Sequence, residues 1–308
     1  MNRKLSKWLI TGSSGFLGRN FGQICRDHSE IETICVSRNR VDSNLRFNSD
    51  SLHGDFKRKP FWDELIAFHQ PDVVVNLAGA TPPAPHDILW EANFNWIPEL
   101  LQAVIESTAP IKIVHAGSAA ELGEVPLSML PVSENYEAKP LTDYGRSKLA
   151  ATQAILGANL KVKPVVARLF NLCGPGQGQA QAWGRYAAEI ISRKAENPIK
   201  IKSFGLGNRR DFLDIRDAAK AIFQLAELAG STGLYHVGCG KSISIGEGLK
   251  MLIEISQLRV DIEEEIQPRY SSGPSDSIAD IRRIRNETGW LPNIEIKQSL
   301  HDLWETLQ

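Results

Sequence analysis

The sequence predicts an α/β fold: a doubly wound parallel β-sheet covered by helices on both faces, with a smaller lobe from the C-terminal part. Three observations predict it. Short runs of β-branched residues alternate with helical patterns over the first half of the chain. A glycine-rich loop joins the first such run to the first helix. After Pro175 the regular alternation of strand and helix patterns gives way to a more mixed order. The 308 residues are enough for one large domain or two coupled ones.

The expected strands of the main sheet follow one another at regular intervals. They are 8–10, 31–36, 72–78, 111–116 and 165–170, with helical spacing between them at 16–25, 61–69 and 90–107. Strands that read as continuous apolar runs are typical of a parallel sheet buried on both faces.

Beyond Pro175 the expected elements are more mixed. They are helices at 183–194, 217–229 and 245–256, short strands at 199–201 and 233–237, and a loop rich in Pro, Gly and Ser at 267–277. We expect residues 1–172 to form the sheet domain, with return segments near 205–238. The rest of 173–308 is expected to form an interleaved lobe, without a clean cut in the sequence.

The composition excludes several classes of protein. The net charge is −1, so we expect neither a nucleic-acid partner nor binding to an anionic membrane. No stretch approaches the roughly 20 apolar residues of a membrane span, and the N-terminus lacks the apolar region of a signal peptide. The four cysteines show no metal-ligand spacing, which favours a reduced, cytoplasmic protein without a metal site.

The glycine loop runs from Thr11 to Gly18 as Thr-Gly-Ser-Ser-Gly-Phe-Leu-Gly. Gly12 permits a tight turn, Gly15 lets the backbone approach a pyrophosphate, and Gly18 allows close helix–sheet packing. The free N–H groups and positive dipole of the helix N-terminus suit phosphates. The loop therefore predicts a dinucleotide site, the alternative being an ordinary strand–helix turn. The expected cofactor contacts here are Gly12, Ser14, Gly15, Phe16, Leu17 and Gly18.

The end of the second strand helps to select the cofactor. A carboxylate at this point would bind the ribose 2′-OH of NAD, but here Ser37 and Arg38 follow Val36. A hydroxyl and a guanidinium suit a 2′-phosphate, so NADP is favoured over NAD. The alternative is a solvated basic turn.

Three residues further along could move a proton. Tyr144 and Lys148 lie four residues apart on an expected helix and so share one face. An adjacent ammonium is expected to lower the pKa of the phenol from about 10 toward neutrality. Ser118 follows the strand at 111–116, at the end of a parallel sheet where ligands bind. Alone, each feature is typical of a solvated helix face or a turn; behind a dinucleotide loop they indicate a catalytic site.

Together, these motifs resemble the extended short-chain dehydrogenase/reductase family, in its branch of sugar-nucleotide epimerases, dehydratases and reductases. The match runs over nearly the whole chain. Four further motifs carry it: Asn93 before a helix with Leu100 and Leu101; Arg168, Asn171, Gly174 and Pro175; Arg210-Asp211-Phe212; and Gly289-Trp290-Leu291-Pro292. The resemblance implies a Rossmann domain at 1–172 and a substrate-binding lobe within 173–308.

The resemblance also implies roles for single residues. Tyr144 is expected to act as general acid or base in hydride transfer at a sugar carbon, Lys148 to tune it and hold the nicotinamide ribose, and Ser118 to hold the reacting oxygen. Further cofactor contacts are expected at Asp55, Leu77, Ala78, Gly79 and Asn93, and at Tyr144 and Lys148 themselves. Substrate contacts are expected at Thr81, Ser118, Asn171, Arg185, Arg210 and Arg269. Family members commonly form homodimers through the Tyr-x-x-x-Lys helix, so a homodimer is expected by analogy.

The residues after Ser118 distinguish the branches of the family. Dehydratases carry Asp-Glu there and GDP-fucose synthases carry a Cys, whereas this chain has Ala119 and Ala120, which cannot abstract a proton. The stretch Arg168-Leu169-Phe170-Asn171, followed by Gly174-Pro175-Gly176-Gln177, is most like that of GDP-4-keto-6-deoxymannose reductases, and Pro274-Ser275-Asp276 fits too. One departure is Gly273, which replaces an arginine common in them. The prediction is NADPH-dependent reduction of the 4-keto group of a nucleotide-diphospho-4-keto-6-deoxyhexose. The alternatives are an NAD-dependent sugar-nucleotide 4-epimerase and a non-catalytic NADP-binding sensor or scaffold.

Overall fold

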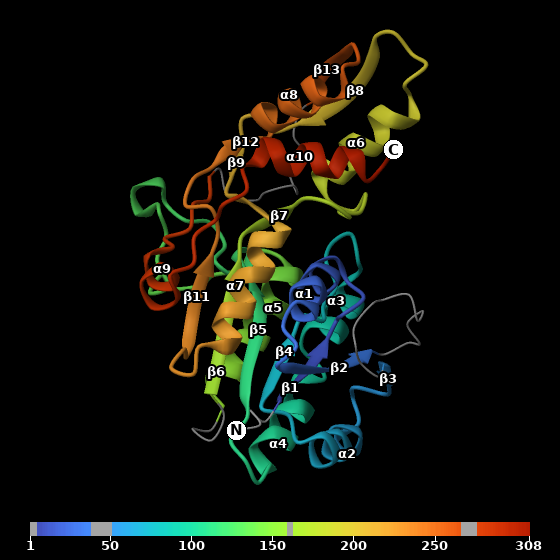
Figure 1. The fold of residues 1–308 in the computed structure, drawn as a ribbon. Helices are drawn as coiled ribbons and strands as arrows, with labels where there is room; N and C mark the ends of the chain where they lie inside the picture. Colours follow the sequence, from blue (N-terminus) through green and yellow to red (C-terminus); the bar gives the residue numbers. More distant parts are fainter. Residues whose placement is uncertain (1–4, 38–50, 159–162, 266–275) are drawn as a thin grey trace.

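A seven-stranded parallel sheet forms the body of the protein, and a second group of helices and strands lies beyond one end of it (Figure 1). The computed structural model describes residues 5–37, 51–158, 163–265 and 276–308. Helices cover both faces of the sheet, which confirms the expected doubly wound α/β class.

The order of the strands places a crevice near the middle of the sheet. The strands are β1 (Ser6–Thr11), β2 (Ile31–Ser37), β3 (Ser51–His53), β4 (Val73–Asn76), β5 (Lys112–Ser118), β6 (Lys163–Leu169) and β11 (Gly233–Val237). Their order is β11-β6-β5-β4-β1-β2-β3, with every neighbouring pair parallel. The order reverses between β1 and β4, so ligands are expected at the carboxyl ends of these strands.

Two hydrophobic cores lie on opposite faces of this sheet. Helices α1 (Phe16–Arg26) and α7 (Ile215–Glu227) pack on one face, and α2 (Lys59–His69), α4 (Ile97–Glu106) and α5 (Asp143–Leu156) pack on the other. Neighbouring residues of β5 point to opposite faces of the sheet. Val114 packs in the core under α7, and Ile113 packs in the core under α4 and α5. This alternation explains why the strand reads as an unbroken apolar run.

The helix expected at 90–107 is divided in the structure. It forms α3 (His86–Asn93) and α4, with an interruption at 94–96. Pro98 lies in the first turn of α4, where its missing N–H costs nothing. The uninterrupted apolar spacing concealed this boundary.

The C-terminal part builds a lobe with a core of its own. It contains α6 (Ala182–Ser192), β8 (Ile199–Phe204), α8 (Ile245–Ser256), β13 (Val260–Glu265) and α10 (Ile296–Glu305), all in the upper part of Figure 1. Short pairs connect this lobe to the sheet: β7 (Asn171–Cys173) with β10 (Phe212–Asp214), and β9 (Arg209–Arg210) with β12 (Ile243–Ser244). The expected return segment supplies β11, the outer strand of the main sheet. A second return was not expected: α9 (Arg282–Thr288) packs near β11 and brings Trp290 into the core under α7.

Both ends of α7 are tied to other elements. At its start, the Asp214 carboxylate accepts from the Arg216 backbone N–H at 2.8 Å and from the Ser299 hydroxyl of α10 at 2.6 Å. At its end, the ammonium of Lys112 from β5 donates to the Leu228 carbonyl and to the Ser231 hydroxyl, both at 2.6 Å. A cation suits the carbonyls at a helix C-terminus, although burial lowers the pKa of Lys112 to about 8.

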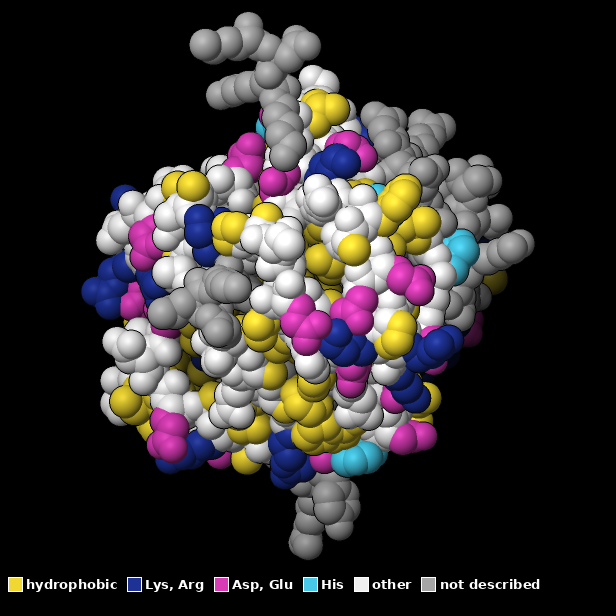
Figure 2. Space-filling view, turned by 90° about the horizontal axis from the view of Figure 1, so that it is seen from below, with side chains coloured by type: hydrophobic (Ala, Val, Ile, Leu, Met, Phe, Trp, Pro, Cys, Tyr) yellow, Lys and Arg dark blue, Asp and Glu magenta, His cyan; other side chains and the backbone are white. Residues whose placement is uncertain are grey.

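The surface agrees with the small net charge. On the face seen from below, basic and acidic side chains are interspersed (Figure 2). Among the described residues, no helix is both long and apolar enough to cross a membrane.

Candidate active site at the carboxyl ends of the strands

A cavity of about 520 Å³ lies between the carboxyl ends of the central strands and the C-terminal lobe. Five of the predicted site residues line it: Thr81, Ser118, Tyr144, Asn171 and Arg210. They come from separate segments of the chain, and the fold brings them to one space.

The glycine loop presses against the end of β4. Gly12 has φ +73°, and a Cβ there would lie 2.5 Å from the Ala78 nitrogen. A Cβ on Gly18 would lie 2.1 Å from the Gly12 carbonyl oxygen. Helix α1 begins after Gly15, and all of its residues belong to the described part of the chain. It has neither a side-chain N-cap nor an acidic residue in its first turn. Its first N–H groups are therefore available to an anion, which fits the pyrophosphate of a dinucleotide.

The region expected to bind the adenosine half is only partly described. Ser37 ends β2, and its hydroxyl lies 3.0 Å from Nδ1 of His53 at the end of β3. Asp55 is exposed, and its carboxylate accepts from the Lys57 backbone N–H at 3.1 Å. Arg38 lies outside the described residues, so its expected contact with a 2′-phosphate stays a prediction.

Asn93 shapes the loop that follows β4. Its side-chain oxygen accepts from the Ala80 N–H at 2.9 Å, and its side-chain nitrogen donates to the Ala80 carbonyl at 3.1 Å and to the Ser147 hydroxyl at 3.0 Å. The loop with Leu77, Ala78 and Gly79 is thereby held against α5. Direct contact of Asn93 with a cofactor stays a prediction.

The side chains of Tyr144 and Ser118 both line the cavity, and Ser118 is close enough to act on the phenol as a hydrogen-bonding partner. Thr142 caps α5 by accepting from the Gly145 N–H at 3.1 Å, which places Tyr144 in the first turn of the helix. Burial raises the pKa of Tyr144 above its usual value of 10, and the bond to Ser118 offsets part of this rise.

The expected lowering of the pKa of Tyr144 by Lys148 is therefore wrong for this structure. The buried ammonium of Lys148 donates to the Ala116 carbonyl of β5 at 2.5 Å, and burial lowers its own pKa to about 8. Desolvation of the phenol raises its pKa, the nearby Glu121 carboxylate adds to the rise, and Lys148 is not among the groups that shift it. The phenol is consequently protonated at neutral pH.

The three predicted substrate arginines have different positions. Arg210 lines the cavity and is half-buried, and it donates to the Arg209 carbonyl at 2.7 Å. Arg185 is exposed on α6 outside the cavity lining, with its guanidinium 4.9 Å from the ring centroid of Tyr186. Arg269 lies outside the described residues.

Sequence reasoning missed Glu121, a buried carboxylate whose oxygen accepts from the Ser118 N–H at 2.7 Å. A signal was present, because a serine followed three positions later by a glutamate is a capping box. The helix that follows is a single turn at 119–121, too short for apolar spacing to indicate it beforehand.

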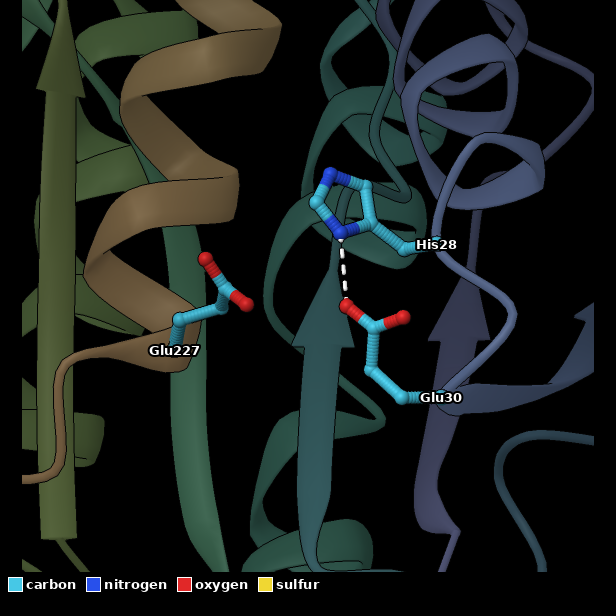
Figure 3. Close-up of side chains that lie close together, drawn as sticks. All are labelled: His28, Glu30 and Glu227. Carbon is cyan, nitrogen blue, oxygen red and sulfur yellow. Dashed lines mark hydrogen bonds and ion pairs between the residues drawn. The ribbon is translucent and has the colours of Figure 1, made fainter.

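A different cluster lies away from this cavity. His28 and Glu30 come from the turn between α1 and β2, and Glu227 comes from the end of α7. One ligand atom of each lies within 4.8 Å of the others (Figure 3). Nδ1 of His28 is 2.8 Å from the Glu30 carboxylate, and its ring packs on Phe223 at 4.4 Å. The cluster is partly exposed and lies at the amino ends of the strands, so it is separate from the site around Ser118. The sequence contains no local motif that predicts this cluster, because Glu227 lies far along the chain from His28 and Glu30.

Known proteins share this architecture. A family model described as "NAD dependent epimerase/dehydratase family" matches residues 8–238. The chain is 28 % identical over 302 residues to a dTDP-6-deoxy-L-talose 4-dehydrogenase (NAD(P)(+)) of Kitasatospora kifunensis, covering 96 % of this chain and 93 % of the relative. It is 29 % identical over 310 residues to a GDP-6-deoxy-D-mannose reductase of Pseudomonas aeruginosa, covering 96 % of each chain.

Solved structures agree. RMD from Pseudomonas aeruginosa, in a structure with NADPH, superposes with a TM-score of 0.82 and 25 % identity over 98 % of both chains. The family model covers most of the chain, and these relatives match it almost from end to end. The protein belongs to the NAD dependent epimerase/dehydratase family and is a nicotinamide-dinucleotide enzyme of the extended short-chain dehydrogenase/reductase type.

Proposed function

We propose that the protein reduces the 4-keto group of a nucleotide-diphospho-4-keto-6-deoxyhexose with NADPH, giving a nucleotide-diphospho-6-deoxysugar. A relative at 29 % identity is named as a reductase of this kind, and another at 28 % is named for the reverse direction of such chemistry on a different sugar nucleotide.

One observation carries the proposal: the cavity is poor in groups that could move a second proton. Among its described lining residues, only Tyr144 and Arg210 are ionisable. Ala119, Ala120, Leu122 and Val125 form the wall beside Ser118. Dehydration, and epimerisation through a carbanion, each need a further acid or base, whereas carbonyl reduction needs a single proton donor.

The protein's own groups fit that single proton transfer. When bound, the nicotinamide cofactor supplies the hydride to the carbonyl carbon. Tyr144 is protonated at neutral pH because burial raises its pKa, so it donates its proton to the carbonyl oxygen. Ser118 donates a hydrogen bond to that oxygen as negative charge develops on it. Lys148, fixed on the Ala116 carbonyl, keeps a positive charge beneath the site below a pH of about 8.

The other assignments belong to the same proposal. We assign Arg210 to the diphosphate of the substrate, because it is the single cationic side chain among the described lining residues. NADP is favoured over NAD by Ser37 and Arg38 in place of a carboxylate. A cytoplasmic location fits the four free thiols, and a homodimer follows from the family analogy.

Loss of NADPH absorbance with a panel of GDP-, dTDP-, UDP- and CDP-4-keto-6-deoxysugars tests the proposal. We expect turnover with added NADPH and a fall of about 10³-fold in kcat for Tyr144→Phe, with the cofactor Kd unchanged. Dinucleotide that copurifies at full occupancy, with turnover that needs no added NADPH, would instead establish the 4-epimerase. Unchanged function of the Tyr144→Phe variant would establish a non-catalytic role.

A further inference from the structure

A buried ion pair lies directly behind Ser118. Glu121, in the single turn after β5, and Arg168, near the end of β6, have side chains that are only 0 % and 3 % exposed. One carboxylate oxygen, Oε2, accepts from two nitrogens of the guanidinium at 3.0 and 2.9 Å. Charges removed from water are tolerated only when paired in good hydrogen-bonding geometry, so this pair holds Glu121 in one orientation.

The second carboxylate oxygen holds the backbone of Ser118. Oε1 accepts from the Ser118 N–H at 2.7 Å and from the Thr152 hydroxyl of α5 at 3.1 Å. Gly117 leaves the space for it, because a Cβ there would lie 2.8 Å from this oxygen. Four donors therefore fix the carboxylate, and one of them is the residue whose hydroxyl faces the cavity.

The Ser118 side chain is fixed by the same turn. Its oxygen accepts from the Ala120 N–H at 3.2 Å, and the hydroxyl is close enough to Tyr144 to lower the pKa of that phenol. Glu121 itself does not line the cavity. The carboxylate can therefore affect the reaction only through its bond to Ser118 or through the electric field of its charge.

The network continues to a further residue of the cavity wall. A terminal nitrogen of Arg168 donates to Nε2 of His236 at 3.3 Å, and Nδ1 of His236 donates to the carbonyl of Val132, a lining residue, at 3.0 Å. His236 is neutral in this arrangement, since burial lowers its pKa to about 3. The ion pair is therefore connected, through His236, to the loop that carries Val132.

We propose that Glu121, locked by Arg168, is a positioning residue that holds the Ser118 hydroxyl in register with Tyr144. The inference rests on the proposed function only in that Ser118 acts on the reacting oxygen, a role that it would have in reduction and in 4-epimerisation alike. It assigns to the pair a function in catalysis beyond the stability of the fold.

A double-mutant cycle between Glu121 and Ser118 tests this inference. We expect Glu121→Ala to lower kcat about 100-fold with KM within about threefold, because small displacements of a reacting group cost this much. In the Ser118→Ala background, Glu121→Ala should lower kcat by less than about threefold, because the hydroxyl that Glu121 positions is already absent. An equal loss in both backgrounds would overturn the proposal.

A second variant avoids burying Arg168 without a partner. Gly117→Ala introduces a methyl that displaces Oε1 and leaves both charges in place, so the same loss of kcat and the same non-additivity are expected. Asp214→Asn is the control: it removes the charge of another fully buried carboxylate, which pairs with the partly exposed Arg216 and not with the turn that carries Ser118. We expect it to lower the melting temperature and to leave kcat within about threefold.

Amide hydrogen exchange separates this inference from the proposed function. Loss of the bond from the Ser118 N–H should speed exchange of that amide at least tenfold in Glu121→Ala and Gly117→Ala, with α5 unaffected. A wild-type protein that turns over none of the sugar nucleotides refutes the proposed function, and the exchange result still decides the positioning. Unchanged exchange at Ser118 in both variants would contradict it.

Discussion

Replacing the glycines of the Thr11–Gly18 loop one at a time is expected to separate folding from cofactor binding. Gly15 has φ −72°, and a Cβ there would lie 3.2 Å from the Gly12 carbonyl oxygen, a tight but adjustable contact. Gly15→Ala should therefore change the free energy of unfolding by less than about 1 kcal/mol. Its methyl would stand at the start of α1, where the pyrophosphate is expected, so the Kd for NADPH should rise at least tenfold, about 1.4 kcal/mol.

Gly12→Ala should behave differently. Its φ of +73° costs an alanine about 1–2 kcal/mol, and the new Cβ would lie 2.5 Å from backbone atoms of Leu77 and Ala78 that cannot rotate away. Overpacking adds about 1–3 kcal/mol, so the free energy of unfolding should fall by roughly 2–5 kcal/mol.

Urea unfolding and a fluorescence titration with NADPH measure the two effects on the same samples. Gly230→Ala is the matched control, because no other atom lies within 4 Å of a Cβ at that position. The reasoning is refuted if Gly15→Ala binds NADPH like the wild type, or if it loses as much stability as Gly12→Ala.

Three further predictions concern single side chains. Arg210→Ala should raise KM for the sugar nucleotide at least tenfold, with little change for Arg185→Ala outside the cavity; equal effects of the two would remove the assignment of Arg210. His236 stays neutral in the folded protein, whose pKa for this residue is about 3, but takes up a proton below about pH 6.5 in the unfolded chain. The free energy of unfolding should therefore fall as the pH drops, by roughly 2 kcal/mol at pH 5 from this residue alone. Urea unfolding of His236→Gln at several pH values should lack this contribution. Lys112→Met should lower the free energy of unfolding by at least about 2 kcal/mol, because buried carbonyls at the end of α7 lose their donor, whereas the exposed Lys163→Met on the paired strand should not.

Much of the fold was predictable because its signals are local. The apolar runs of β1, β4 and β5, the glycine loop and the spacing of Tyr144 and Lys148 each lie within one short segment. Their order along the chain then predicted the sheet, and the topology brought Ser118 and Tyr144 to one cavity.

The remainder depended on contacts between distant segments. The pKa of Tyr144 was predicted in the wrong direction because spacing reveals a neighbouring charge but not the desolvation of the phenol. The pairing of Glu121 with Arg168 joins residues 47 positions apart, and no local pattern indicates it. The break between α3 and α4 was concealed by apolar residues that continue on both sides.

The attachment of α7 at both ends has a mechanical consequence. The helix packs along the sheet, with its first turn bound to α10 of the C-terminal lobe through Asp214 and Ser299, and its last turn bound to β5 through Lys112. Helix α7 therefore links the lobe rigidly to the sheet. A hinge rotation of the lobe would have to break the hydrogen bonds at one end of this helix. Opening and closing of the cavity around a substrate are accordingly expected in its lining loops, with the lobe and the sheet moving as one body.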